Sequence, residues 1–207
     1  MPYLVPFWGE EPVVVHAIQR VRCPDGHWRV SYPDEQPGDR DAAGALWTRM
    51  TSVEQPTIAE MGQVHSHRQR DCMLTPRCQV CGDMLPPDAV PWVVPLTEVE
   101  HTGPGEDQFL TATPPTCLSC AAVARRLCPL LRSAGSRLYT VRSYRPWGVI
   151  GTDASIATLG ELVLNKPIKP RWIGYHQTAE LHQAIAEQLI VQLLKADVID
   201  DVPGRVA

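Results

Sequence analysis

The 207-residue sequence lacks features that mark several large classes of protein. No stretch approaches 18 uninterrupted apolar residues, so we expect no membrane-spanning helix. Residues 1–15 carry Glu10 and Glu11 and no basic segment, so we expect no signal peptide and a cytoplasmic location with reduced thiols. The motifs Gly-x-Ser-x-Gly and His-Glu-x-x-His are absent, as is a Gly-rich phosphate loop.

The overall composition is that of a folded chain rather than a disordered or strongly basic one. Hydrophobic residues make up 44%, and the formal net charge is -4, which excludes a uniformly basic nucleic-acid coat. The 20 prolines argue against long uninterrupted helices. The length suits one domain with appendages or two small domains.

Seven cysteines are the most informative feature, and four of them form two matched pairs. Cys78-x-x-Cys81 and Cys117-x-x-Cys120 each place two thiols within one tight turn, and two such turns complete the tetrahedron of a structural zinc site. Gly82 follows the first pair, where a glycine lets the backbone fold back beneath the metal. We therefore predict that these four cysteines bind a structural Zn²⁺ that leaves no open position for catalysis.

The other three cysteines are expected to be bystanders. Cys128 lies eight residues beyond Cys120 on an expected helix, about 12 Å along its axis, and is too far away to share the ion. Cys23 fits an ordinary strand or turn position. Cys72 precedes Cys78 by six residues, and a replacement of one ligand by Cys72 or by a histidine stays open.

The periodicity of the chain predicts an α+β fold in three segments. Residues 1–74 are expected to be β-rich, with strands at 28–32 and 45–50 and a helix that begins at the capping box Thr57–Glu60 and runs towards Cys72. Residues 75–132 form the zinc module: a knuckle, a hairpin of 90–96 with 109–111, and a helix from Thr116 to Leu131 with a kink or stop at Pro129. The apolar face of that helix is expected to be Val123, Leu127, Leu130 and Leu131.

Residues 133–207 are expected to hold short strands followed by the longest helix. The strands are predicted at 138–144, 147–150, 162–164 and 172–175. Leu181, Ile185, Leu189 and Leu193 recur every four residues, which predicts a long amphipathic helix over 178–196. We expect this segment to pack on the rest of the molecule, where one compact domain overall stays an alternative to separate parts, or to dock a protein partner or a second copy.

The segment 78–132 resembles a treble clef, in which a knuckle and a helix start each supply a CxxC pair. It is similar to the HNH endonucleases, where a Val-Asp-His triplet precedes the second pair and its histidine activates water. Val99-Glu100-His101 looks similar, which makes His101 a candidate catalytic residue. The hairpin Asn and the late helix His or Asn that complete the family's metal site have no counterpart, because the only Asn is Asn165 and no His follows Cys120 before His176. Without these metal ligands a general base alone should cleave a phosphodiester poorly, so HNH-like chemistry is kept only as a further alternative.

The whole chain also resembles small, uncharacterised zinc-binding proteins of high-GC, Gram-positive actinobacteria. The resemblance rests on Met1-Pro-Tyr, Trp8-Gly-Glu, Asp39-Arg-Asp41, Leu46-Trp47, Arg68-Gln-Arg70, the two cysteine pairs with their neighbours, and Cys128-Pro129. A bias of 16 Arg to 3 Lys fits such a genome. This resemblance implies zinc binding and assigns no activity.

The charge of the chain is distributed unevenly. From Gln108 to Thr152 there is no Asp or Glu, while six arginines give +6: Arg125, Arg126, Arg132, Arg137, Arg142 and Arg145. Tyr139, Tyr144 and Trp147 lie among them, and interleaved Arg and aromatic residues can grip a phosphate backbone and stack bases. The alternative is that these arginines pair with acids elsewhere in the chain.

Three functions remain open from the sequence. The first is a zinc-stabilised protein that binds nucleic acid or another polyanion through the arginine segment. The second is a zinc-stabilised protein-interaction or accessory module. The third is an enzyme, either a divergent HNH-like nuclease or one whose site is assembled from distant loops.

Overall fold

The computed structural model describes residues 2–12, 18–54, 58–97, 100–101, 109–154 and 170–203. The chain divides into two compact units, each assembled from pieces that are distant in sequence. Unit 1 comprises Met1–Pro6, Ala59–Trp147 and Ile190–Ala207, and unit 2 comprises Phe7–Ile58 and Gly148–Leu189. Both units contain helices and strands and are rich in strands, which confirms the predicted α+β class.

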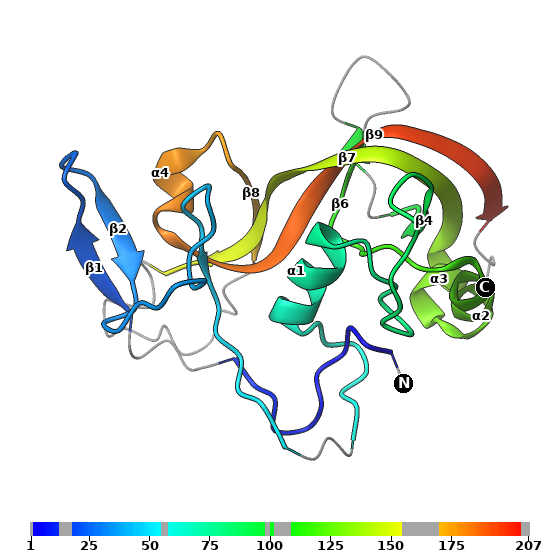
Figure 1. Ribbon diagram of the computed structural model, residues 1–207, viewed down its shortest axis with the longest axis horizontal. Coiled ribbons are helices and arrows are strands. Elements are labelled where there is room, and N and C mark those ends of the chain that lie inside the picture. Colours follow the sequence, from blue (N-terminus) through cyan, green and yellow to red (C-terminus); the bar gives the residue numbers. More distant parts are fainter. Residues whose placement is uncertain are drawn as a thin grey trace. The chain divides into compact units, whose positions relative to one another are not determined.

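Unit 1 is a curled sheet with three helices (Figure 1). Its strand order is β4-β7-β9-β6-β5, and the pairs β4–β7, β6–β9 and β5–β6 are antiparallel. The elements are α1 (Ser66–Leu74), β4 (Val90–Pro95), β5 (Glu100–His101), β6 (Phe109–Thr111), α2 (Leu118–Leu127), α3 (Pro129–Ala134), and the parts of β7 (Gly135–Asp153) and β9 (Ala184–Pro203) that belong to this unit. Trp92, Phe109 and Leu193 are fully buried in its core.

Unit 2 contains a two-stranded antiparallel sheet, β1 (Gln19–Arg22) with β2 (Trp28–Ser31). In the same unit, β8 (Arg171–Gly174) pairs with residues 148–151 of β7, and β3 (Leu46–Trp47) pairs with residues 185–186 of β9. A single turn of helix, α4 (Thr178–Leu181), precedes β9. The strands predicted at 28–32 and 172–175 are confirmed, and the one predicted at 45–50 shrinks to Leu46–Trp47.

The long helix predicted over 178–196 is wrong, because most of this segment is the strand β9. A four-residue spacing keeps side chains on one face of a helix, but it also keeps them on one face of a strand, where the period is two. Residues 189–193 are buried on both faces of the strand, with Gln192 as the one polar side chain among them, so the alternation of apolar and polar residues that marks a half-buried strand is missing. No helix in the described parts of the chain approaches the predicted length.

The helix predicted from Thr57 begins nine residues later, at Ser66, with His65 as its N-cap. Gly62 has φ 92°, a left-handed conformation that a helix through this point would not allow. The His65 ring accepts a hydrogen bond from the Arg68 N–H and replaces the predicted cap. Thr57 itself lies outside the described residues, as does the strand predicted at 162–164.

The predicted hairpin of 90–96 with 109–111 is also wrong. β4 pairs with residues 136–141 of β7, whereas β6 pairs with β5 and with residues 191–193 of β9. Both segments are buried, and buried strands carry no local signal that selects a partner. The two strands predicted at 138–144 and 147–150 are parts of the single strand β7.

The helix predicted from Thr116 to Leu131 is interrupted where Pro129 was expected to stop it. α2 ends at Leu127, Cys128 is extended, and α3 begins at Pro129, whose fixed φ suits the first helical position. The predicted apolar face is wrong, because Val123, Leu127 and Leu130 are exposed. Only Leu131 packs inward, against the cluster of Val93, Ala121 and Leu138.

Candidate metal centre

The first cysteine pair sits on a tight knuckle that its own backbone closes. The Gly82 N–H donates to the Cys78 carbonyl at 2.9 Å, and the Cys78 N–H donates to the Asp83 carbonyl at 2.8 Å. The Val80 N–H points at the Cys78 sulfur at 3.4 Å, a donor that favours a thiolate. Gly82 has φ 79°, so the glycine predicted beneath the metal occupies a left-handed position.

The second pair sits at the start of α2. Cys117 is the N-cap residue, and Cys120 lies in the first turn. No acidic side chain occupies that turn, and the Cys117 side chain makes no cap hydrogen bond. Because the positive end of the helix dipole favours anions, thiolates are the negative groups that this helix start can accommodate.

Hydrogen bonds from one residue of the knuckle tie it to the segment before α2. The Gln79 N–H donates to the Pro115 carbonyl at 2.9 Å. The Gln79 amide nitrogen donates to the Pro114 carbonyl at 2.7 Å and to the Thr116 hydroxyl at 2.8 Å. Hydrogen bonds therefore link the two pairs, which are 36 residues apart in sequence, in addition to any link through the sulfurs.

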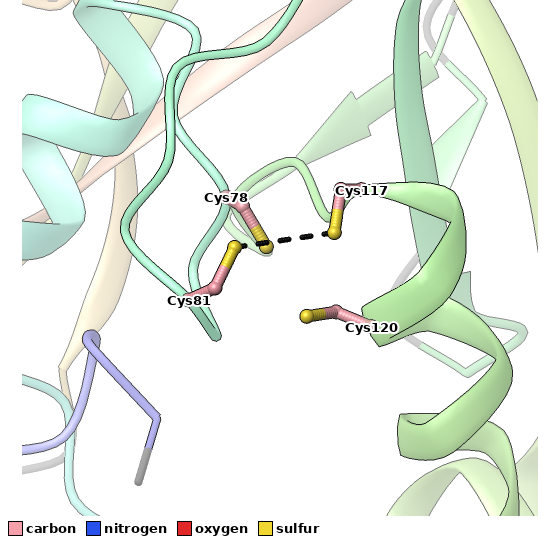
Figure 2. A group of neighbouring side chains, drawn as sticks. All are labelled: Cys78, Cys81, Cys117 and Cys120. Carbon is pink, nitrogen blue, oxygen red and sulfur yellow. Dashed lines mark hydrogen bonds between the residues drawn. The ribbon is translucent and has the colours of Figure 1, made fainter.

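The four predicted ligands converge on one point (Figure 2). All four sulfurs lie within 4.8 Å of one another, and the Cys81 and Cys117 sulfurs are 4.0 Å apart. A tetrahedral zinc ion with sulfurs at about 2.3 Å requires sulfur–sulfur distances of about 3.8 Å. The cluster therefore fits a four-thiolate metal ion after small side-chain adjustments.

The electrostatics of the cluster also fit a cation. Burial, with added effects from Cys117 and Cys78, raises the pKa of Cys120 to about 11. Burial opposes ionisation of Cys117 too, but hydrogen bonds from the Ser119 hydroxyl and from Cys120 outweigh it and lower the Cys117 pKa to about 7. Four adjacent thiols cannot all lose their protons unless a cation replaces them, which is the chemistry of a metal–thiolate site.

The remaining cysteines do not enter the cluster. Cys72 is fully buried on α1, and burial raises the pKa of its thiol to about 12. Cys128 follows α2 and Cys23 follows β1, both partly exposed. Among the described residues, neither Cys72 nor a histidine joins the four sulfurs.

The six arginines of the acid-free segment fall on several elements rather than on one. Arg125 Nη1 pairs with Asp200 at 2.6 Å, Arg142 pairs with Asp197 at 2.5 Å, and Arg145 donates to Gln192. Arg137 is partly buried on β7. Arg126 and Arg132 are exposed, on α2 and α3 respectively.

The candidate catalytic histidine lies on β5, where it pairs with Phe109 of β6. The side chain of His101 is outside the described residues.

The apolar residues on the outside of α2 are exposed, although their spacing predicted that they would be buried. The spacing correctly predicted a helix after Cys117, but it could not show which of its side chains are exposed.

Comparison of the chain with protein-family models, with curated proteins and with solved structures found no match. The resemblances to HNH endonucleases and to actinobacterial zinc proteins therefore stay predictions.

Within the described residues, no helix combines the length and apolar character needed to cross a bilayer.

Proposed function

We propose that the protein is a zinc-stabilised interaction module, in which one structural Zn²⁺ fixes α2 so that its outer face is presented to a partner protein. The observation that carries this proposal is the combination of four convergent cysteine sulfurs with a helix that buries a single residue, Ala121. Both features belong to unit 1.

Zinc is the metal that best suits the ligand set. Thiolates are soft ligands that select Zn²⁺, Cu(I) or iron–sulfur clusters, and a closed four-sulfur tetrahedron is typical of structural zinc. A Zn²⁺ bound by Cys78, Cys81, Cys117 and Cys120 keeps no position for water. The ion would stabilise the fold and would activate no substrate.

A metal anchor allows a helix to keep its apolar side chains in solvent. An ordinary surface helix is held by burial of one apolar face, each large side chain contributing about 1.5–3 kcal/mol. α2 buries Ala121 alone, so its position depends on the knuckle, on the segment before it and on the metal. Its larger apolar side chains remain available for a partner.

Metal content and local protection test the zinc centre. The purified protein should hold one zinc per chain, measured by inductively coupled plasma mass spectrometry. Cys117→Ser should lose the metal and should lose amide protection at 78–82 and 117–127 in hydrogen-exchange mass spectrometry. Cys128→Ser is the matched control, since its sulfur lies outside the cluster, and it should keep both. Unchanged protection after complete zinc removal would contradict a role for the ion in holding α2.

A second candidate function is binding of nucleic acid or another polyanion. The exposure of Arg126 and Arg132, in a segment with no acidic residue from 108 to 152, supports this candidate. The pairing of Arg125 and Arg142 with Asp200 and Asp197 counts against it, because these charges are already neutralised.

Fluorescence anisotropy with a 20-base-pair DNA duplex and a 20-nucleotide RNA tests this candidate. Polyanion binding predicts an affinity that falls steeply with salt and drops in the double variant Arg126→Glu/Arg132→Glu. The double variant Arg20→Glu/Arg22→Glu, on β1, removes the same charge elsewhere and should retain binding. An absence of binding at low salt would exclude this function.

A further inference from the structure

The solvent-facing half of α2 is a mainly apolar surface that carries one cation, Arg126, near its C-terminal end. Its exposed residues form two series with a spacing of four: Leu118, Ala122 and Arg126 in one, and Ser119, Val123 and Leu127 in the other. Leu127 is 71% exposed, Leu118 is 56% exposed and Val123 is 42% exposed. At 100° per residue, the direction in which Arg126 points around the helix axis lies about midway between the directions of Leu118 and Leu127.

A further apolar side chain is exposed at the start of the next helix. Leu130 on α3 is 43% exposed and follows Leu127 directly after the break at Cys128 and Pro129. Exposed apolar side chains that occur singly need no explanation, but four leucine or valine residues within 13 positions form a group. The outer face, as we call Leu118, Ala122, Val123, Arg126, Leu127 and Leu130, combines apolar side chains with one arginine and no acidic residue, and interface cores are likewise poor in charged residues other than arginine.

The charge on this face comes from a single free cation. Arg125 points away and pairs with Asp200, and its side chain is only 13% exposed. Arg126 has no hydrogen-bond or ion-pair partner within the part of the chain that the structure describes. Since no acidic residue occurs between 108 and 152, the local sequence supplies no counter-charge.

This pattern selects among possible occupants. A second copy of the chain, docked by the same face across a two-fold axis, would present the same acid-free surface and would leave both Arg126 side chains without a counter-charge. A nucleic acid would find one unpaired cation among apolar side chains, whereas phosphate backbones are bound by several. A peptide helix with apolar residues on one face and a carboxylate among them matches both the apolar side chains and the unpaired charge of Arg126.

Resting on the proposed interaction function, we propose that the outer face of α2 docks an acidic amphipathic helix of a partner protein. The partner's apolar residues, spaced three and four apart, cover Val123, Leu127 and Leu130, and an Asp or Glu on the same face pairs with Arg126. In an interface from which water is excluded, that pair fixes the register of the two helices.

A displayed library of 18-residue helical peptides tests the proposal on the full-length, zinc-loaded chain. Leu is fixed at i, i+3, i+4 and i+7, and the neighbouring positions vary among Glu, Lys, Gln and Ala. We expect enrichment of peptides with Glu beside the Leu stripe. An enriched peptide should bind at least about tenfold more weakly to Leu127→Asp and to Arg126→Glu, since the first removes an apolar contact and the second removes the ion pair of the proposed interface. Arg22→Glu, an exposed charge reversal on β1, is the control and should bind normally.

A charge exchange separates recognition from structural damage. The variant Arg126→Glu should recover affinity for the enriched peptide when its Glu is changed to Lys, and its zinc content should be unchanged. Enrichment of Leu-rich peptides without preference for Glu, with binding still lost in Leu127→Asp, would overturn the acidic partner while the interaction function stands. No enrichment at all would overturn both. Dimerisation abolished by Leu127→Asp, or binding of a DNA duplex abolished by Arg126→Glu, would replace the proposed occupant.

Discussion

At the scale of single residues, Gly82 shows how closely the knuckle is specified. Its φ of 79° lies in the region that L-residues avoid, and a Cβ built on it would lie 3.2 Å from the Tyr3 ring. The Tyr3 N–H also donates to the Val80 carbonyl at 2.9 Å, so the ring is held against the knuckle. The glycine therefore satisfies a backbone requirement and a packing requirement at the same position.

Gly82→Ala should destabilise the protein by more than about 1–2 kcal/mol, the usual cost of a left-handed L-residue, and should weaken zinc binding. Gly62→Ala is the matched control, with φ 92° and nothing within 4 Å of its Cβ. Urea unfolding and competition with a chromophoric zinc chelator measure the two effects. Equal losses in the two variants would show that the Tyr3 contact adds nothing.

Glu35 in unit 2 gives a pH-dependent test. Side-chain hydrogen bonds from Arg40, at 3.1 and 2.9 Å, together with one from Ser31, lower the Glu35 pKa below its ordinary value of 4.5 despite partial burial. A lowered pKa in the folded state stabilises the fold above the unfolded pKa, and the contribution disappears as the pH falls through the folded value. Glu35→Gln should therefore cost about 1–3 kcal/mol near neutral pH and progressively less below about pH 4.5.

Denaturant unfolding between pH 3 and pH 7 measures this difference. Glu54→Gln, which alters an exposed carboxylate, should leave the curve of stability against pH almost unchanged. A constant difference between the wild type and Glu35→Gln over this range would contradict the ionic role of Glu35.

At the scale of elements, β9 shows why apolar spacing alone misidentifies a segment. Leu181, Ile185, Leu189 and Leu193 fit a helix and a strand equally well, because four is a multiple of the strand period and close to the helix period. The β-branched residues Ile190 and Val191 favour a strand, but propensity is a weak signal beside tertiary pairing. Pairing with β3 and β6 on either side of Leu189 decides the conformation.

Gly151→Ala tests the strand directly. The Cβ of the new alanine would lie 2.7 Å from the Ile185 carbonyl oxygen, a backbone atom that cannot move alone. We expect destabilisation of about 2–4 kcal/mol, comparable to severe overpacking in a core. Gly38→Ala, whose Cβ meets nothing within 4 Å, should cost only the penalty of its φ of 99°. A smaller loss for Gly151→Ala than for Gly38→Ala in thermal unfolding would contradict β9 as a strand at this point.

At the scale of the whole molecule, the seven cysteines divide into three environments. Four sulfurs share the candidate metal centre, Cys72 is fully buried, and Cys23 and Cys128 are partly exposed. The net charge of -4 likewise conceals an acid-free segment, whose arginines are partly neutralised by Asp197 and Asp200. Totals taken over the chain hide both distributions.

Alkylation by iodoacetamide at pH 8, read by peptide mass spectrometry, should separate these environments. With zinc bound, only Cys23 and Cys128 should react readily. Chelation should add Cys81, Cys117 and Cys120, whose side chains are exposed or partly exposed, while Cys72 should stay protected because its side chain is fully buried and the reagent cannot reach its sulfur. Fast labelling of Cys72 in the folded protein would contradict its burial.

The sequence by itself determined the features that depend on neighbours a few positions apart. The two cysteine pairs, the glycine after the first pair, the stop at Pro129 and the strands predicted at 28–32 and 172–175, which the structure has at 28–31 and 171–174, all follow from local geometry. Only the tertiary structure decided which strand pairs with β4, that residues 184–203 are extended, and that α2 keeps Val123 and Leu127 in solvent. These features depend on pairing and burial between residues far apart in the chain, where several partners satisfy the same local pattern and the packing of the whole unit selects one.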